Sequence, residues 1–495
     1  MSQNMKLDKT IMAVPMLLVV VSSVFFALFA EGSLEVLGRV RDFLGNDLGL
    51  LYLLFGLFCF GLTLYLACGQ KGRIRLGNRD TPRYSQWVWG AMVFTSTMAA
   101  DIIFFSLIEW AYYAGEPHVA ARGDVLLWSA TMPLFHWGPI VWSFYIVLAV
   151  SIGYMVHTKG VHRQRLSEMC RGALGHRVDG LLGKAIDIVA VFGLIAGTAT
   201  TFSLATPLIT AGIAHLFGWA EGAWLTVGIL LVVAGIYTTV VLSGMRGIEK
   251  LAKLSVTLFV ILLLYVLLLG GHTRFILETG LSAVGNMAQH FVSLSTWTDP
   301  LRQDYFPQSW TVFYWAYWVS WSVATPFFIA TISQGRTIRN TVFGVYFFGL
   351  LGTFTSFIIL GGHGMAQQFL QGIPLVEQMG TLSETTLIIG MLQALPVSGL
   401  AIVLLVVTMI IFYATTFDSL TLVIANYSYQ HLPADTEPAK GVRVFWALAF
   451  IILPIGLILS EGALHSLQAL AIIAAAPIAV IMCVVVWSFF KLSKV

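Results

Sequence analysis

The sequence has few charged residues. Aspartate, glutamate, lysine and arginine make up 10% of its 495 residues, whereas soluble proteins contain about 25%. A soluble protein of this length needs more charged side chains to cover its surface, so soluble enzymes and nucleic-acid-binding proteins are excluded. Hydrophobic residues reach 58% and the mean hydropathy is +0.85, which indicates an integral membrane protein.

Cysteine is also scarce, and its four copies form no pattern. Cys59, Cys68, Cys170 and Cys483 are far apart, with no Cys-x-x-Cys pair and no cluster with histidine. This excludes a disulfide framework and a cysteine-based metal site, so we expect all four to be packing residues.

Twelve apolar segments are each long enough to cross a bilayer as a helix, which takes about 20 residues. The runs of about ten alternating residues that are typical of membrane β-barrels are not evident. The sequence therefore predicts an all-α polytopic membrane protein. The expected spans are 11–30, 49–69, 86–113, 125–156, 184–217, 223–244, 253–271, 309–333, 341–361, 396–430, 443–460 and 466–489.

Lysine and arginine are concentrated in alternate connections between these spans. The connections at 70–85 and 157–184 are strongly basic, and both ends of the chain carry lysines. By the positive-inside rule we expect both termini in the cytoplasm, which requires an even number of spans.

Two spans contain residues that interrupt a helix. Residues 94–101 (Phe-Thr-Ser-Thr-Met-Ala-Ala-Asp) are small or polar, and residues 136–139 are His-Trp-Gly-Pro. Unwound backbone at this depth is tolerated only where it lines a cavity or is buried in protein. Paired broken helices also mark the binding site of many secondary transporters.

Four acidic residues lie within the spans: Asp101, Glu109, Asp187 and Asp418. A central acid costs roughly 2.5–3.5 kcal/mol to insert, so each is a candidate functional group. We expect Asp101 to meet a solute because it lies in the small-residue break. The other three are interpreted as structural, and hydroxyl side chains between 415 and 419 are expected to bond to Asp418.

Aromatic residues gather inside the fourth and eighth spans. Trp318 and Trp321 share one helix face, Trp142 and Tyr145 are similarly spaced, and Trp137 would reach the same cavity only if Gly-Pro bends its helix. A quaternary ammonium group has no N–H to donate, so aromatic faces suit it, at about 0.5–2 kcal/mol each when desolvated. Such rings are also common in packing and interfacial belts, so the spacing alone leaves both interpretations open.

Four segments resemble the betaine/carnitine/choline transporter family: FHWGPIVWSFY (135–145), TDPLRQDYFPQSWTVFYWAYWVSW (298–321), QGRTIRN (334–340) and TTFDSLTLV (415–423). The resemblance covers nearly the whole chain. It implies twelve transmembrane helices in a leucine-transporter-type fold, in which two leading helices precede a five-plus-five inverted repeat.

The resemblance divides the chain into five parts. Residues 1–84 would hold the cytoplasmic N-terminus and two leading helices, 85–271 the first repeat, 309–489 the second repeat and 490–495 a short cytoplasmic tail. The pattern around 281–294 predicts an interfacial amphipathic helix in the outer loop 272–308.

The resemblance also implies an aromatic box that binds a trimethylammonium substrate such as choline, glycine betaine or carnitine. Trp137, Trp142, Tyr145, Trp318 and Trp321 fall on box and gate positions of the family. Tyr112 falls near a contact of the carnitine exchangers, and Tyr317 replaces a frequent tryptophan. The family further implies alternating access, a homotrimer and the bacterial cytoplasmic (inner) membrane.

By resemblance, residues 97–101 of this chain replace a glycine-rich run that is found in sodium-coupled betaine carriers. Asp101 occupies the last position of that run. In this it resembles the choline carriers, which look proton-coupled. A carboxylate that faces the box favours a cation such as choline over a zwitterion, by on the order of 4 kcal/mol at 4 Å before desolvation. A protonated Asp101 would instead tolerate a zwitterion.

No cofactor is expected, apart from Na⁺ or H⁺ as coupling ion. By resemblance to sodium-coupled members, the hydroxyls of Thr415 and Thr416 and the carbonyls of Thr95, Met98 and Phe412 would form an oxygen shell. Threonines in membrane helices often bond to their own backbone instead. The alternative is an ion-independent carnitine-type antiporter. Such exchangers carry an arginine near the ion site, and Ser255 is the residue of this chain that comes nearest to the position of that arginine.

Two other functional classes, channels and membrane-embedded enzymes, are disfavoured. A channel would show a repeated pore filter or a charged ring, and an enzyme would show a metal or nucleophile cluster. Neither is evident, and His136 stands alone in its span. We therefore expect a secondary transporter and not an enzyme.

Overall fold

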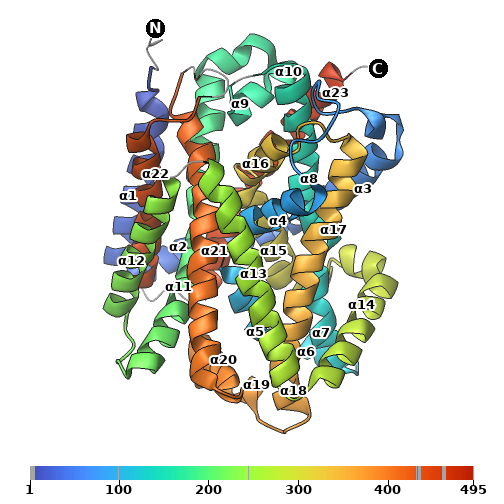
Figure 1. Cartoon of the computed structure of the whole chain (residues 1–495), viewed down its shortest axis with the longest axis vertical. Helices are drawn as coiled ribbons and strands as arrows, with labels where there is room; N and C mark the ends of the chain where they lie inside the picture. Colours follow the sequence, from blue (N-terminus) through green and yellow to red (C-terminus); the bar gives the residue numbers. More distant parts are fainter. Residues whose placement is uncertain are drawn as a thin grey trace.

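The computed structural model of the chain is almost entirely helical (Figure 1). It describes residues 6–97, 100–161, 163–242, 245–430, 432, 436–459 and 464–493. Within these ranges β-type pairing is limited to two isolated bridges, Leu7 with Tyr429 and Arg75 with Thr337, and there is no strand. The expected all-α class is confirmed.

Ten helical segments of the described chain are long and apolar enough to cross a membrane. The two other expected spans are broken helices: α4 (Gln86–Thr97) with α5 (Asp101–Ala114), and α15 (Val312–Trp321) with α16 (Thr325–Ile332). Together these account for the twelve expected spans. The ten segments are Lys9–Phe26, Gly49–Cys68, Val125–Thr158, Leu181–Phe217, Ala223–Val241, Lys250–Leu269, Ile338–Phe369, Ser398–Tyr427, Lys440–Leu459 and Ala469–Leu492.

The two broken helices hold matching places in the chain. They are the third and eighth spans, so each begins a set of five. In Figure 1, α4 and α5 run away from the end of the molecule where the chain starts, whereas α15 and α16 run toward it. Matching breaks in spans of opposite direction are the pattern of an inverted repeat. The helices α1 (Lys9–Leu28) and α3 (Gly49–Cys68) are the two leading spans.

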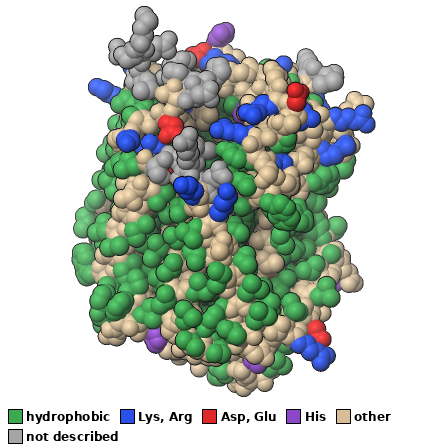
Figure 2. Space-filling model, in the orientation of Figure 1, with side chains coloured by type: hydrophobic (Ala, Val, Ile, Leu, Met, Phe, Trp, Pro, Cys, Tyr) green, Lys and Arg blue, Asp and Glu red, His purple; other side chains and the backbone are tan. Residues whose placement is uncertain are grey.

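The surface has the layering that a bilayer requires. Hydrophobic side chains cover the middle of the face in Figure 2, and lysine and arginine side chains gather toward one end. In Figure 1 the N and C marks lie at that same end. An apolar band between polar ends matches a helical bundle that spans the hydrocarbon core.

The fourth span is interrupted where the sequence predicts. Helix α7 (Val125–His136) stops before Trp137, and α8 (Pro139–Gly153) begins at the proline, which has no N–H to donate. Gly138 is required here, because a Cβ at this position would lie 2.5 Å from the carbonyl oxygen of Leu134. The break leaves Trp137 2% exposed and inside the bundle.

The loop between the seventh and eighth spans contains one long helix, α14 (Thr273–Ser295), which includes the expected amphipathic stretch. Ile276, Ala283 and Met287 are buried on one side of it, whereas Leu277 and Leu281 are exposed. It packs against α7.

All four cysteines are free thiols. Cys59 and Cys170 are buried, as expected for packing residues. Cys68 and Cys483 are exposed, so the expected packing role is wrong for these two.

A buried ion cluster ties three distant segments together at the end where the chain starts. Nη1 of Arg165 lies 3.2 Å from Oδ2 of Asp8 and 3.3 Å from Oδ2 of Asp187, and Nη2 donates to the carbonyl of Tyr429 at 2.6 Å. The hydroxyl of Ser167 also donates to Asp187, at 2.8 Å. These contacts match the structural role expected for Asp187.

Candidate functional site

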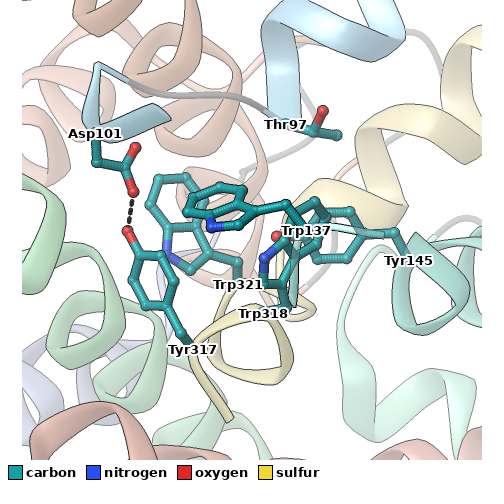
Figure 3. Close-up of a pocket in the computed structure, with 7 residues that line it drawn as sticks. All are labelled: Thr97, Asp101, Trp137, Tyr145, Tyr317, Trp318 and Trp321. Carbon is teal, nitrogen blue, oxygen red and sulfur yellow. Dashed lines mark hydrogen bonds between the residues drawn. The ribbon is translucent and has the colours of Figure 1, made fainter. Parts of the chain in front are cut away.

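A small cavity of about 10 Å³ lies where the two broken helices meet (Figure 3). Thr97 ends α4 and Asp101 begins α5, so both flank the break in the third span. Trp321 ends α15, at the break in the eighth span. The lining residues are Thr97, Asp101, Trp137, Tyr145, Tyr317, Trp318 and Trp321.

Trp318 is the centre of an aromatic cluster. Its ring centroid lies 4.9 Å from that of Tyr145, 5.8 Å from that of Trp137 and 5.1 Å from that of Trp142. The rings are tilted or edge-on to one another, which their quadrupoles favour. Rings from the fourth and eighth spans therefore share one chamber.

Tyr317 and Trp321 form another wall of the cavity. Their ring centroids are 6.2 Å apart, with an angle of 76° between the ring planes. Trp321 rests on Phe417 of α21 (Ser398–Tyr427), at 6.3 Å. The eighth span thus contributes three aromatic side chains to the cavity from one helix, α15.

Asp101 is the acidic group of this cavity. It is 4% exposed, and the hydroxyl of Tyr317 donates a hydrogen bond to its Oδ2 (Figure 3). The hydroxyl of Thr201, on α11 (Leu181–Phe217), donates to the same oxygen at 3.4 Å. Among the described residues, no lysine or arginine lines the cavity, so its charge favours a cation.

Trp137 is held by a second buried acid. Its Nε1 donates to Oε2 of Glu109 at 2.8 Å, and the hydroxyl of Tyr113 donates to Oε1 at 2.7 Å. Glu109, which we interpreted as structural, therefore contacts a ring of the cavity. The spacing contained a signal for this: Asp101, Phe105 and Glu109 are four apart, so they form one stripe of α5. Phe105 also packs against Trp137, at 5.5 Å.

The structure brings together six of the eight expected substrate residues: Asp101, Trp137, Tyr145, Tyr317, Trp318 and Trp321. Two threonines that sequence reasoning missed join them, Thr97 in the lining and Thr201 behind Asp101. Thr97 belongs to the small and polar break at 94–101, which was a signal for it, whereas only the packing of α11 on the cavity identifies Thr201.

Two expected residues lie elsewhere. Trp142 packs behind Trp318 and against Gly349, where a Cβ would lie 2.5 Å from the indole, so it does not line the cavity. Tyr112 also lies outside the lining: its ring packs on Trp310 at 5.4 Å and its hydroxyl donates to Glu384 at 3.3 Å. Neither residue lines the cavity in this structure, and a substrate-binding role for each stays a prediction.

The expected ion site joins α4 to α21. The hydroxyl of Thr416 donates to the carbonyl oxygen of Thr95 at 3.2 Å. The hydroxyl of Thr415 instead bonds within its own helix, to the carbonyl of Phe412 at 3.0 Å, and lies 3.2 Å from the hydroxyl of Ser255. Met98, the fifth expected residue, lies outside the described residues.

The carboxylate of Asp418 does not have the hydrogen-bond partners that we expect from the sequence. Thr415 and Ser419 direct their hydroxyls to carbonyls of their own helix, and Thr416 bonds to Thr95. Oδ2 of Asp418 has no hydrogen-bond partner in the described chain. The expected hydroxyl bonds to this residue are therefore wrong.

Known proteins resemble this chain along nearly its whole length. A model of the betaine/carnitine/choline family of transporters matches residues 10–495. A probable glycine betaine transporter of Desulfitobacterium hafniense is 31% identical over 506 residues, which cover 99% of this chain and 98% of that protein. The osmo-dependent choline transporter BetT2 of Acinetobacter baylyi is 29% identical over 504 residues, which cover 98% and 71%.

A comparison with solved structures gives a weak alignment with a membrane transporter. It is a Na⁺-coupled sialic acid symporter in a substrate-bound outward-open state, with a TM-score of 0.44 and 12% identity. The match covers 91% of this chain and 86% of that one.

Proposed function

Because this chain belongs to the betaine/carnitine/choline transporter family, we propose that it is a secondary active transporter of a quaternary ammonium compound. The observation that carries the proposal is a buried cavity walled by aromatic rings, with one carboxylate and no basic side chain among its lining residues. Alternating access would expose this cavity to each side of the bacterial cytoplasmic membrane in turn.

The cavity suits a methylated ammonium head. Such a cation is weakly hydrated and has no hydrogen to donate, so ring faces replace its water at about 0.5–2 kcal/mol each. Trp137, Tyr145 and Trp318 form a cluster with centroid distances below 6 Å to Trp318. Three such faces would offset much of the cost of dehydrating the head.

We further propose that choline is preferred over a zwitterionic betaine. Asp101 faces the cavity and no cationic side chain among the lining residues neutralises it. At 4 Å and an effective dielectric constant near 20, its attraction to an onium charge is on the order of 4 kcal/mol before desolvation. The carboxylate of glycine betaine or carnitine would instead be repelled.

Uptake driven by Na⁺ or H⁺ is the proposed mode. The hydroxyl of Thr416 and the carbonyl oxygen of Thr95 lie 3.2 Å apart between α21 and α4, and two such hard oxygens support Na⁺ as a coupling ion. Asp101 is the candidate proton carrier. The neutral Ser255, rather than an arginine, lies beside Thr415, which favours ion coupling over carnitine-type antiport.

The assembly and orientation are proposed from the family resemblance and the charge pattern. Both termini would lie in the cytoplasm, because the basic residues gather at the end of the bundle where the termini lie. Three copies would form a homotrimer in the lipid bilayer.

Ligand binding to the purified chain tests the proposal. Choline, glycine betaine and carnitine are titrated with and without Na⁺ and at two pH values. We expect choline to bind most tightly, with an affinity that depends on Na⁺ or on pH; no binding of any of the three contradicts the proposed function. Counterflow in vesicles without an ion gradient then separates the modes, because an antiporter runs there and a symporter slows.

A further inference from the structure

Four indoles stand in or directly behind the cavity wall, and only one of them is anchored by its N–H. In the described chain the Nε1 atoms of Trp142, Trp318 and Trp321 are buried and have no hydrogen-bond partner. Nε1 of Trp137 donates to Glu109 at 2.8 Å. Trp137 is therefore the ring of the wall whose orientation depends on a specific polar contact.

Glu109 is built into the wall behind this ring. It is fully buried on α5, and each of its carboxylate oxygens accepts one bond, from Trp137 and from Tyr113. The hydroxyl of Tyr113 lies 2.6 Å from Nδ1 of His136, whose Nε2 lies 3.0 Å from the hydroxyl of Thr311. This polar chain holds Oε1 of Glu109, the carboxylate oxygen that does not bond to Trp137.

The backbone alone does not fix the Trp137 ring. Trp137 lies in the interruption between α7 and α8, with φ −102° and ψ 21°, and Gly138 follows it with no side chain to pack. The other contacts of the ring are apolar or aromatic, including Phe105 at 5.5 Å and Phe357 at 5.3 Å. Such contacts allow the ring to turn, whereas the bond to Glu109 selects one orientation.

We propose that Glu109 is a positioning residue of the cation site, which acts on the substrate through the indole of Trp137. Its oxygen holds the N–H, so one ring face stays turned toward the cavity. An N–H that donates to an acceptor also shifts electron density into the indole ring, which strengthens the attraction of its face for a cation. The inference rests on the proposed function, because it requires that the cavity takes a quaternary ammonium head.

Choline binding to the purified full chain tests this with two substitutions of different chemistry. Glu109→Leu removes the acceptor, and we expect binding to weaken about tenfold or more, the loss typical of one hydrogen bond to a charged group. Glu109→Gln keeps an amide oxygen for the indole N–H, and we expect binding within about threefold of the unsubstituted chain. Equal weakening by both substitutions would show that the charge matters and not the acceptor.

The chain offers a matched control outside the cavity. Nε1 of Trp310 donates to Glu116 at 2.7 Å, the same kind of bond in the outer part of the protein. Glu116→Gln should leave choline affinity unchanged. If it weakens binding as much as Glu109→Leu, the effect is not specific to the cavity wall.

A double-mutant cycle shows whether Glu109 acts through Trp137. Trp137→Phe keeps a ring face but has no N–H, so it alone should weaken binding about as much as Glu109→Leu. Adding Glu109→Leu to Trp137→Phe should then cost little more. Independent, multiplying losses would overturn the proposal, and so would a Trp137→Phe chain that binds choline normally, even if Glu109→Leu does not fold.

Choline binding to the unsubstituted chain distinguishes a failure of the proposed function from a failure of the positioning role. If it binds no quaternary ammonium compound, the proposed function fails. If it binds choline and the Glu109 and Trp137 variants bind equally well, only the positioning role fails.

Discussion

The hydroxyl of Tyr317 donates a hydrogen bond to the carboxylate of Asp101, which joins the two broken helices across the cavity. Asp101 is the first residue of α5, and Tyr317 lies one turn before α15 ends. The acid is thus held against the aromatic wall, in the place where it acts on the charge of a bound solute.

Replacing Asp101 with asparagine should reverse part of the substrate preference. We expect choline affinity to fall about tenfold or more, because the attraction of a carboxylate for an onium charge is lost. Glycine betaine affinity should stay constant or rise, because its own carboxylate is no longer repelled. Competition binding on the purified chain measures both. An unchanged ratio of the two affinities in Asp101→Asn contradicts the role.

Truncating Trp318 should remove most transport. Trp318→Leu deletes the ring that contacts Tyr145 and Trp137, and each lost face costs about 0.5–2 kcal/mol of cation binding, so we expect uptake to fall at least about tenfold. Trp315→Leu is the matched control, because Trp315 is equally buried on α15 but packs against Gly56 of α3. Both variants leave a core cavity and should lose stability, by about 3–5 kcal/mol. Radiolabelled choline uptake, normalised to folded protein, separates the effects; similar uptake by both variants contradicts the aromatic cage.

Removing the Thr416 hydroxyl should weaken sodium coupling. Thr416→Val keeps the shape of the side chain but removes the oxygen that bonds to the carbonyl of Thr95. We expect the Na⁺ concentration for half-maximal choline binding to rise about tenfold. Thr408→Val, on the same helix, deletes a hydroxyl that bonds only to the carbonyl of Leu404 and should change nothing. Binding that is independent of Na⁺ in the unsubstituted chain would instead favour protons as the coupling ion.

A histidine outside the membrane spans should make stability depend on pH. His118 lies on α6 (Pro117–Ala121), where Nε2 accepts from Arg122 at 2.8 Å and Nδ1 faces Asp304 at 2.9 Å. Burial, and then Arg122, lowers the pKa of His118 below its usual value, although Asp304 acts in the opposite direction. We give more weight to the neutral form, because only a neutral ring nitrogen can accept the bond from Arg122.

The sign of the effect follows from this lowered pKa. The folded state binds the proton less readily than the unfolded chain, so stability is complete above about pH 6.5 and decreases as pH falls toward the pKa of the folded state. The melting temperature in detergent should therefore decrease on mild acidification. His118→Gln should flatten the profile in that range, and an identical pH profile in both proteins would contradict the assignment.

Much of the site was predictable because it depends on local chemistry. Gly138 and Pro139 together disfavour a continuous helix, so the break that turns Trp137 inward could be predicted from the sequence. Pro326 carries a similar signal for the break at 322–324. The spacing of Trp318 and Trp321 likewise placed both on one helix face.

The position of Trp142 could not be predicted from the residues next to it in the sequence. It has the same spacing to Tyr145 as Trp318 has to Trp321, and yet it packs behind the wall while Trp318 lines it. The difference is set by Gly349 of α17 (Ile338–Ser356), which leaves space for the Trp142 indole. A distant glycine cannot be paired with a tryptophan by reading either segment alone.

The amino-acid order by itself determined the membrane class, the number of crossings and the identity of the aromatic segments, because hydropathy and helix-breaking residues act over a few turns. Only the tertiary structure decided which rings enclose the cavity, that Tyr317 and Thr201 hold Asp101, and that Glu109 anchors Trp137. These contacts join residues up to 216 positions apart, and side-chain direction across such distances is set by how whole helices pack.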